Sequence, residues 1–170
     1  MANKSSRKRK NLAKAIAAIE TDLLKVSAGS ATFGFDASLE VSFDGLDDQI
    51  RKIAVAKLRA ALPKTEPALA RALDAAMASS SWNWTGGNRD IIDTGALKNS
   101  LQIEYRGMRA IVSYTAPYAA IIHEGGYIRP YGNEAAEPVY LPGRPWVDSV
   151  LVGGGPVPQF DWEAAIRAVL

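Results

Sequence analysis

Two short apolar segments joined by a glycine-containing loop constrain the fold most strongly. Gln102–Tyr105 and Ala110–Tyr114 flank the tetrapeptide Arg106-Gly107-Met108-Arg109. Extended segments separated by such a loop typically pair as an antiparallel hairpin. Apolar and polar residues also alternate over Thr32–Phe43, which indicates a further strand with one buried face. The chain is therefore expected to contain a small, mainly antiparallel sheet.

Helical patterns precede the hairpin. Apolar residues recur at helical spacing over Leu46–Leu62, and Pro63 ends that helix. A second helix is expected to begin at a Thr65 cap and to run to Ala78. Its predicted inner face consists of Leu69, Leu73, Ala76 and Met77. The combined pattern predicts an α+β fold in which the small antiparallel sheet packs against these two helices.

Two further helices are expected near the ends of the chain. Asn11–Val26 carries one apolar stripe, and Ser27-Ala28-Gly29-Ser30 is expected to break that helix. Phe160–Leu170 forms the other helix, with Asp161 as its cap. The 170 residues then divide into a basic arm with an amphipathic helix at 1–30, an α+β body at 31–152, and a glycine hinge with a helix at 153–170.

Positive charge is concentrated at the amino terminus. The first ten residues carry five lysines and arginines and no acid, so the net charge of +2 leaves −3 for the rest of the chain. The arm is interpreted in two ways, which the sequence leaves open. It is either a solvated tail or a segment that contacts DNA phosphates or an acidic protein surface.

The composition excludes several chemistries. No cysteine is present, which removes structural disulfides, thiolate metal sites and cysteine nucleophiles. No apolar run approaches the roughly 18–20 residues that span a bilayer. Lys14, Glu20 and Asp22 interrupt the stretch that would serve as a signal peptide. We therefore expect no membrane partner and no secretion.

Two short sequences resemble motifs found in enzyme active sites, and we interpret both as structural. His123-Glu124 suits acid–base or metal chemistry, but His123 is the single histidine, and adjacent residues on a strand point to opposite faces. Asp93-Thr94-Gly95 matches an aspartic protease motif, which needs a second carboxylate, and no second copy exists. Asp93 and Thr94 are instead expected to hydrogen-bond a turn in which Gly95 supplies a free φ. We expect no enzyme activity, no cofactor and no metal.

Tryptophans at three positions suggest packing or contact. Trp82 and Trp84 lie in a polar, glycine-rich loop at 79–89. They are expected either to fold back on the core or to form an interface with a partner subunit, where tryptophan is enriched. Stacking on a sugar or base is a third, less favoured interpretation. Arg144-Pro145-Trp146 is interpreted as a structural anchor, with the guanidinium near an acid and Trp146 as a hydrophobic plug.

Three motifs follow one another between Asp93 and Val147. They are Asp93-Thr94-Gly95 with Leu97 and Ser100, then Tyr118-Ala119 with Glu124-Gly125, and finally Arg144-Pro145-Trp146. In this order and spacing they resemble the neck and tail-completion proteins of long-tailed bacteriophages, over Leu46–Leu151. Two positions differ from the usual pattern: Gly126-Tyr127 follows where Gly-Thr is usual, and Trp146 replaces a commoner Phe.

The resemblance implies a structural virion protein of the phage neck, made in the host bacterial cytoplasm and acting by assembly and sealing. Six or twelve copies would form a ring through which duplex DNA passes. Portal or adaptor proteins on one side and tail-terminator or tail-tube proteins on the other would be its partners. It also implies that Glu124 holds a turn or pairs with a basic residue. The alternatives are a tail-terminator ring capping the tail tube and, from another class, a small DNA-binding protein that uses the basic arm.

Overall fold

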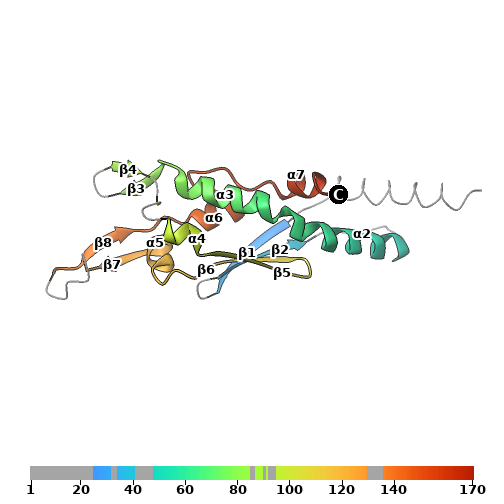
Figure 1. Cartoon of the computed structure of the whole chain (residues 1–170), viewed down its shortest axis with the longest axis horizontal. Helices are drawn as coiled ribbons and strands as arrows, with labels where there is room; N and C mark the ends of the chain where they lie inside the picture. The colour runs from blue at the N-terminus through green and yellow to red at the C-terminus, as the bar shows by residue number, and fades with distance from the viewer. Residues whose placement is uncertain are drawn as a thin grey trace, which may run out of the picture.

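The computed structural model describes residues 25–31, 34–40, 48–84, 87–89, 91, 95–129 and 136–170. Over these residues, helices form one layer and the strands of the main sheet form another (Figure 1). Pairs of strands and helices follow one another along the chain, but the strands pair antiparallel and the helices lie in a layer of their own, which is the arrangement of an α+β fold. The predicted fold class is confirmed at this level.

The main sheet has four antiparallel strands in the order β1-β2-β6-β5. These strands are β1 (Lys25–Ala31), β2 (Gly34–Glu40), β5 (Leu101–Arg106) and β6 (Arg109–Tyr114). β5 and β6 form the predicted hairpin, with Leu101 opposite Tyr114 and Arg106 opposite Arg109. Gly107 in the turn has a φ of 64°, a left-handed value that glycine adopts without a steric penalty. The hairpin is confirmed. β2 lies inside Thr32–Phe43, where the sequence predicts a further strand.

Strand β1 corrects the prediction for the end of the first helix. The segment expected to finish a helix at Val26 and to break at 27–30 is a strand that pairs with β2, from Lys25 opposite Glu40 to Ala31 opposite Gly34. Small residues such as Ser27 and Gly29 have weak local preferences, so pairing with a neighbouring strand decides their conformation. Residues 11–24 of the predicted helix lie outside the described residues. The division of the chain at residue 30 stays a prediction.

The two helices that cover the sheet are confirmed, with two corrections of detail. They are α2 (Asp48–Ala61) and α3 (Glu66–Ala78), joined by the 3₁₀ turn η1 (Leu62–Thr65). All four residues of the predicted inner face of α3 are buried. Ile53, one of the apolar residues at helical spacing that predicted this helix, is 46% exposed rather than buried. Thr65 stands at the predicted N-cap position of α3, but its side chain makes no capping hydrogen bond, and its hydroxyl instead donates to the carbonyl of Leu62 at 2.7 Å.

The remaining elements of the described chain are short; some lie between α3 and the β5–β6 hairpin in sequence, and the others follow that hairpin. They are β3 (Trp82–Trp84), β4 (Gly87–Arg89), α4 (Ala96–Asn99), α5 (Ala119–Glu124), β7 (Gly125–Ile128), β8 (Val139–Pro142), α6 (Trp146–Leu151) and α7 (Trp162–Arg167). β7 and β8 form a two-stranded hairpin at one end of the molecule (Figure 1). The region 127–140 therefore contributes a paired strand at each of its ends.

The glycine run that was predicted as a hinge reverses the chain after α6. Gly153 and Gly154 have φ values of 87° and 81°, which few other residues adopt. The chain then returns beside α6, where the backbone N–H of Phe160 donates to the carbonyl of Val150 at 2.8 Å. Asp161 caps α7 as predicted, since its carboxylate accepts from the N–H of Ala164 at 2.9 Å.

One hydrophobic core lies between the helices and the sheet. Leu69 and Leu73 of α3 belong to the same buried cluster as Val112 of β6 and Val147 of α6. Trp162 of α7 also joins that cluster, so the carboxyl-terminal helix belongs to the body of the fold. Within the described part of the chain, no helix is both long and apolar enough to cross a membrane.

Candidate functional site

Trp146, the aromatic residue of the third motif, lies at the centre of the region where the motifs meet. Its side chain is only 1% exposed. Its ring lies edge-on to Tyr114 of β6, with centroids 5.3 Å apart, and to His123 of α5, with centroids 5.0 Å apart. Edge-to-face contacts are the favoured geometry for such rings. Burial also raises the pKa of Tyr114 far above its ordinary value, so this ring packs as a neutral phenol.

The Arg-Pro-Trp sequence is explained by its backbone. Pro145 has φ −76° and ψ 67°, and the N–H of Trp146 donates to the carbonyl of Arg144 at 2.8 Å. These values describe an inverse γ-turn, for which the fixed φ of proline is suited. The turn starts α6 and directs Trp146 inward. Arg144 itself is fully buried, and its backbone N–H donates to the carbonyl of Ile122 in α5 at 3.0 Å. The predicted acid beside its guanidinium stays a prediction.

Two glycines allow the second and third motifs to pass within backbone contact of each other. A Cβ added to Gly125 would lie 2.5 Å from the backbone nitrogen of Gly143, and one added to Gly143 would lie 2.6 Å from the carbonyl oxygen of Glu124. Gly125 also has a φ of 82° where it ends α5. Both positions therefore require glycine, one for its backbone conformation and its space, the other for its space alone.

The first motif leads into the β5–β6 hairpin and is hydrogen-bonded to the residue that follows that hairpin. Gly95 has a φ of 78° before α4, and Leu97 is buried in the core. The hydroxyl of Ser100 donates to the carbonyl of Leu97 at 2.7 Å. The carbonyl of Ser100 accepts from the N–H of Thr115 at 3.0 Å, next to the start of the second motif. Asp93 and Thr94 lie outside the described residues, so their turn hydrogen bonds stay predictions.

The placement of His123 and Glu124 on a strand is wrong, because both lie in helix α5. A six-residue apolar run does not distinguish a short helix from a strand, and Gly125 ends this helix early. His123 is 5% exposed and its Nε2 lies 3.9 Å from an Oδ of Asp148, whereas Glu124 is exposed. Burial lowers the pKa of His123, and the carboxylates of Asp148 and Glu124 oppose that shift.

The second motif has one buried side, which packs on the core, and one exposed side. Tyr118, at the start of α5, is 40% exposed, whereas His123 packs against Trp146. No group of three or more histidine, cysteine or acidic side chains able to hold a metal ion occurs among the described residues. The fold thus brings six residues of the three motifs into one packed region, which we call the motif cluster: Gly95, Leu97, Ser100, Gly125, Arg144 and Trp146.

Trp82 lies outside the motif cluster and is buried. It is 3% exposed, and its indole N–H donates to the carbonyl of Ala76, near the end of α3, at 2.6 Å. The same carbonyl also accepts from the backbone N–H of Ser79 at 3.3 Å, so the indole adds a second donor at the end of α3. Trp82 therefore folds back on the core and does not present a partner surface. The backbone of Trp84 lies in β3, and its predicted interface role stays a prediction.

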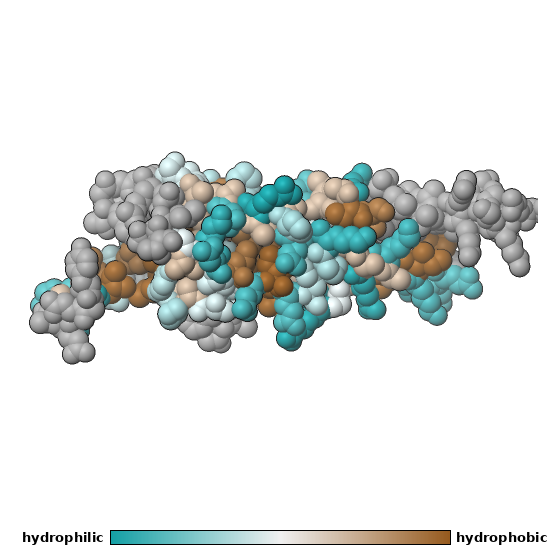
Figure 2. All heavy atoms as spheres, in the orientation of Figure 1, coloured by the Kyte–Doolittle hydropathy of each residue, from teal (hydrophilic) through white to brown (hydrophobic). Residues whose placement is uncertain are grey.

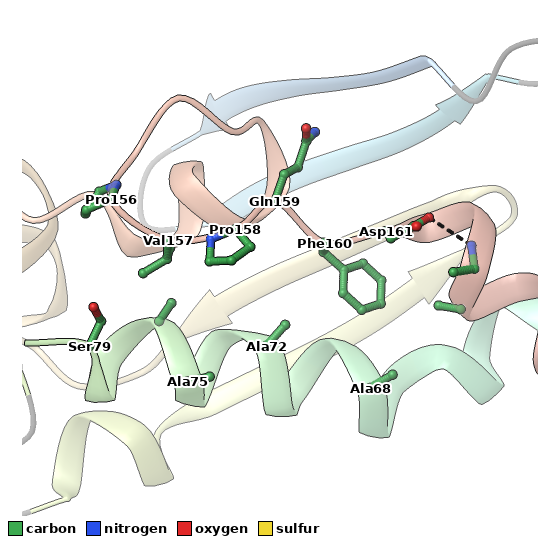
Figure 3. Close-up of a pocket in the computed structure, with 13 residues that line it drawn as sticks. Ala68, Ala72, Ala75, Ser79, Pro156, Val157, Pro158, Gln159, Phe160 and Asp161 are labelled. Carbon is green, nitrogen blue, oxygen red and sulfur yellow. Dashed lines mark hydrogen bonds between the residues drawn. The ribbon is translucent and has the colours of Figure 1, made fainter. Parts of the chain in front are cut away.

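Two surface features were missed by the sequence interpretation. Tyr127 and Tyr140 are directly opposite each other on β7 and β8 and are 72% and 56% exposed. A groove also runs between α3 and the returning segment 156–161 (Figure 3). The alanines on the outer side of α3 form a groove only because segment 156–161 crosses them. That crossing is a long-range contact, which local sequence patterns do not predict.

No protein-family model, curated protein or solved structure matches the chain.

Proposed function

We propose that this chain is a structural protein of the neck of a long-tailed bacteriophage, where copies of it form a ring that joins the DNA-filled head to the tail. The proposal rests on the resemblance of its three motifs to those of neck and tail-completion proteins. In this reading, the ring's activity is assembly and sealing, and no bond is made or broken.

The observation that carries the proposal is the convergence of the three motifs in the motif cluster. The motifs are spread over about fifty residues, yet Arg144 hydrogen-bonds α5, Gly125 passes Gly143, and Ser100 bonds Thr115. Trp146 adds ring contacts from β6 and α5. These contacts hold each motif to another motif or to residues directly beside one, which supports reading the resemblance as a whole rather than as three chance matches.

The charge distribution also favours a conduit over a DNA-gripping protein. Beyond the first ten residues the chain carries a net charge of −3. A protein that holds duplex DNA without sequence preference normally presents a basic face, and each phosphate that it neutralises adds to affinity. A ring through which DNA passes is served by weak contact. The competing proposal from another class is a small DNA-binding protein that uses the basic arm. The alternative within the same class is a tail-terminator ring that caps the tail tube.

The experiment is to measure the mass of the purified full-length chain, alone and mixed with portal or tail-tube protein, together with its DNA binding over a range of salt. The proposal expects a ring of defined copy number, alone or on the partner, and weak DNA binding. A monomer in every mixture that binds duplex DNA with a steep salt dependence would favour the DNA-binding function instead.

A further inference from the structure

We infer that the β7–β8 hairpin of one copy binds in the groove between α3 and the returning segment of the next copy. The inference rests on the proposed ring and names the two surfaces that would form its contact. Both surfaces are exposed on this chain, and they lie at different places on it.

The hairpin is an exposed aromatic surface on a minimal sheet. Tyr127 and Tyr140 form a cross-strand pair whose rings lie edge-on with centroids 5.4 Å apart. Val139, on the adjacent register position, is 46% exposed. Among the described residues, neither β7 nor β8 has a third strand as a neighbour. A two-stranded hairpin is marginally stable alone in water, so a partner surface would stabilise it.

The groove is a cavity of about 560 Å³ with small apolar walls. Ala68, Ala72 and Ala75 line it from α3, while Val157, Pro158 and Phe160 line it from the returning segment (Figure 3). Ser79 lies at one end of the groove and Asp161 at the other. Apolar walls with polar groups at the ends suit tyrosine, whose ring is apolar and whose hydroxyl seeks a hydrogen-bond partner.

The two surfaces match in length and supply useful area. The α3 wall from Ala68 to Ser79 extends about 16 Å at a rise of 1.5 Å per residue, and a four-residue strand extends about 13 Å. If a fully buried tyrosine covers about 200 Å², the exposed fractions of the two tyrosines amount to roughly 250 Å². That is about a third of the ~800 Å² that each side of a specific interface buries.

The position of the two surfaces makes the second copy the occupant. The hairpin forms one end of the molecule, α2 lies toward the other, and the groove runs between them along α3 to α7 (Figure 1). Hydrophobic residues also lie at the hairpin end in the space-filling view (Figure 2). Two different patches at separate places give a head-to-tail, heterologous contact, and such contacts close into rings when the rotation permits.

The test uses two interface variants and two matched controls of the full chain, examined by size-exclusion chromatography with light scattering. Tyr127→Ser with Tyr140→Ser removes the exposed aromatic pair, and Ala75→Arg fills the groove from an exposed helix position. Val152→Ser removes another exposed apolar side chain, and Ala78→Arg adds the same charge to an exposed position of α3 outside the groove. Each interface variant should weaken self-association at least about 10-fold, and the controls should assemble as the unaltered chain does.

Mixing provides the sharper result. The hairpin variant keeps an intact groove and the groove variant keeps an intact hairpin, so an equal mixture should form dimers and nothing larger. Two isologous patches would not give this complementation. A mixture that stays monomeric, or interface variants that assemble normally, overturns the inference.

Covalent capture covers the case in which a variant fails to fold. The chain has no cysteine, so Tyr140→Cys and Ala75→Cys in one chain should give a ladder of disulfide-linked oligomers, and either substitution alone should not. If no disulfide-linked oligomers form under oxidising conditions, the result contradicts the proposed contact. If Ile16→Asp abolishes assembly while the hairpin variant does not, assembly depends on the amino-terminal segment rather than on the hairpin, and the inference is wrong.

The outcomes separate the inference from the proposed function. Rings that form on the portal or tail partner and are unaffected by both variants refute the hairpin contact and leave the neck function standing. A full-length chain that forms no ring alone or with any partner refutes both.

Discussion

Replacing Gly125 with alanine tests whether the close approach of the second and third motifs holds the motif cluster together. Two penalties act at this position. The φ of 82° is unfavourable for any residue with a Cβ, and the added Cβ would lie 2.5 Å from the Gly143 nitrogen and 2.8 Å from the Leu141 carbonyl oxygen. Both contacts are with backbone atoms, so no flexible side chain relieves them.

Two other glycines separate these penalties. Gly154 has a φ of 81° and nothing within 4 Å of an added Cβ, so its replacement measures the backbone term alone. Gly143 is crowded at 2.6 Å by the Glu124 carbonyl oxygen, and its replacement measures mainly the steric term. We expect about 1–2 kcal/mol of destabilisation for Gly154→Ala, about 1–3 kcal/mol for Gly143→Ala, and roughly their sum for Gly125→Ala.

Chemical denaturation of the three variants, followed by tryptophan fluorescence, gives these free energies of unfolding. For a chain of this size, each kcal/mol corresponds to roughly 2–4 °C in the midpoint of thermal unfolding. Gly125→Ala should therefore be the least stable of the three. If Gly125→Ala is no less stable than Gly154→Ala, the segments do not pass at backbone contact and the description of the motif cluster is wrong.

Three further predictions concern other parts of the fold. Trp146→Ala should lower the free energy of unfolding by about 3–5 kcal/mol, as expected for removal of a fully buried large side chain, and Trp146→Phe should lose less because an aromatic ring still meets Tyr114 and His123; equal losses in urea titrations would contradict this. Burial lowers the pKa of His123, so below the ordinary histidine value of about 6.5 the unfolded chain binds more protons than the folded one and stability falls as the pH falls; unfolding measured between about pH 7 and about pH 5 should show a shallower slope for His123→Gln, and an unchanged slope would refute the role of His123. Asp161→Ala should cost about 0.5–2 kcal/mol through loss of the cap on α7, with helix content by circular dichroism as the measurement and Asp161→Asn as the control that retains a capping oxygen.

The parts of the fold that the sequence predicted are those with strong local signals. The β5–β6 hairpin follows from a short glycine loop between extended segments, and α3 follows from the spacing of Leu69, Leu73 and Met77. Strand β1 was missed because its conformation is decided by pairing with β2. Helix α5 was missed because six residues give too little periodicity to identify a helix.

The candidate site shows the same division. The motif residues were identified, but the reasons for them are long-range: Gly125 faces Gly143 across eighteen positions of sequence, and Trp146 meets a ring from β6. The burial of Trp82 depends on a bond to the end of α3 that its polar loop did not indicate. The groove required two segments, separated by about eighty residues, to lie side by side.

A reconstruction of the tailed particle by cryo-electron microscopy tests the central proposal most directly. The neck proposal predicts copies of this chain arranged in a ring around the head–tail axis, between the portal and the tail tube, with DNA in the lumen. Copies that lie away from that axis, or that are wrapped along DNA through the face of the main sheet, would contradict it.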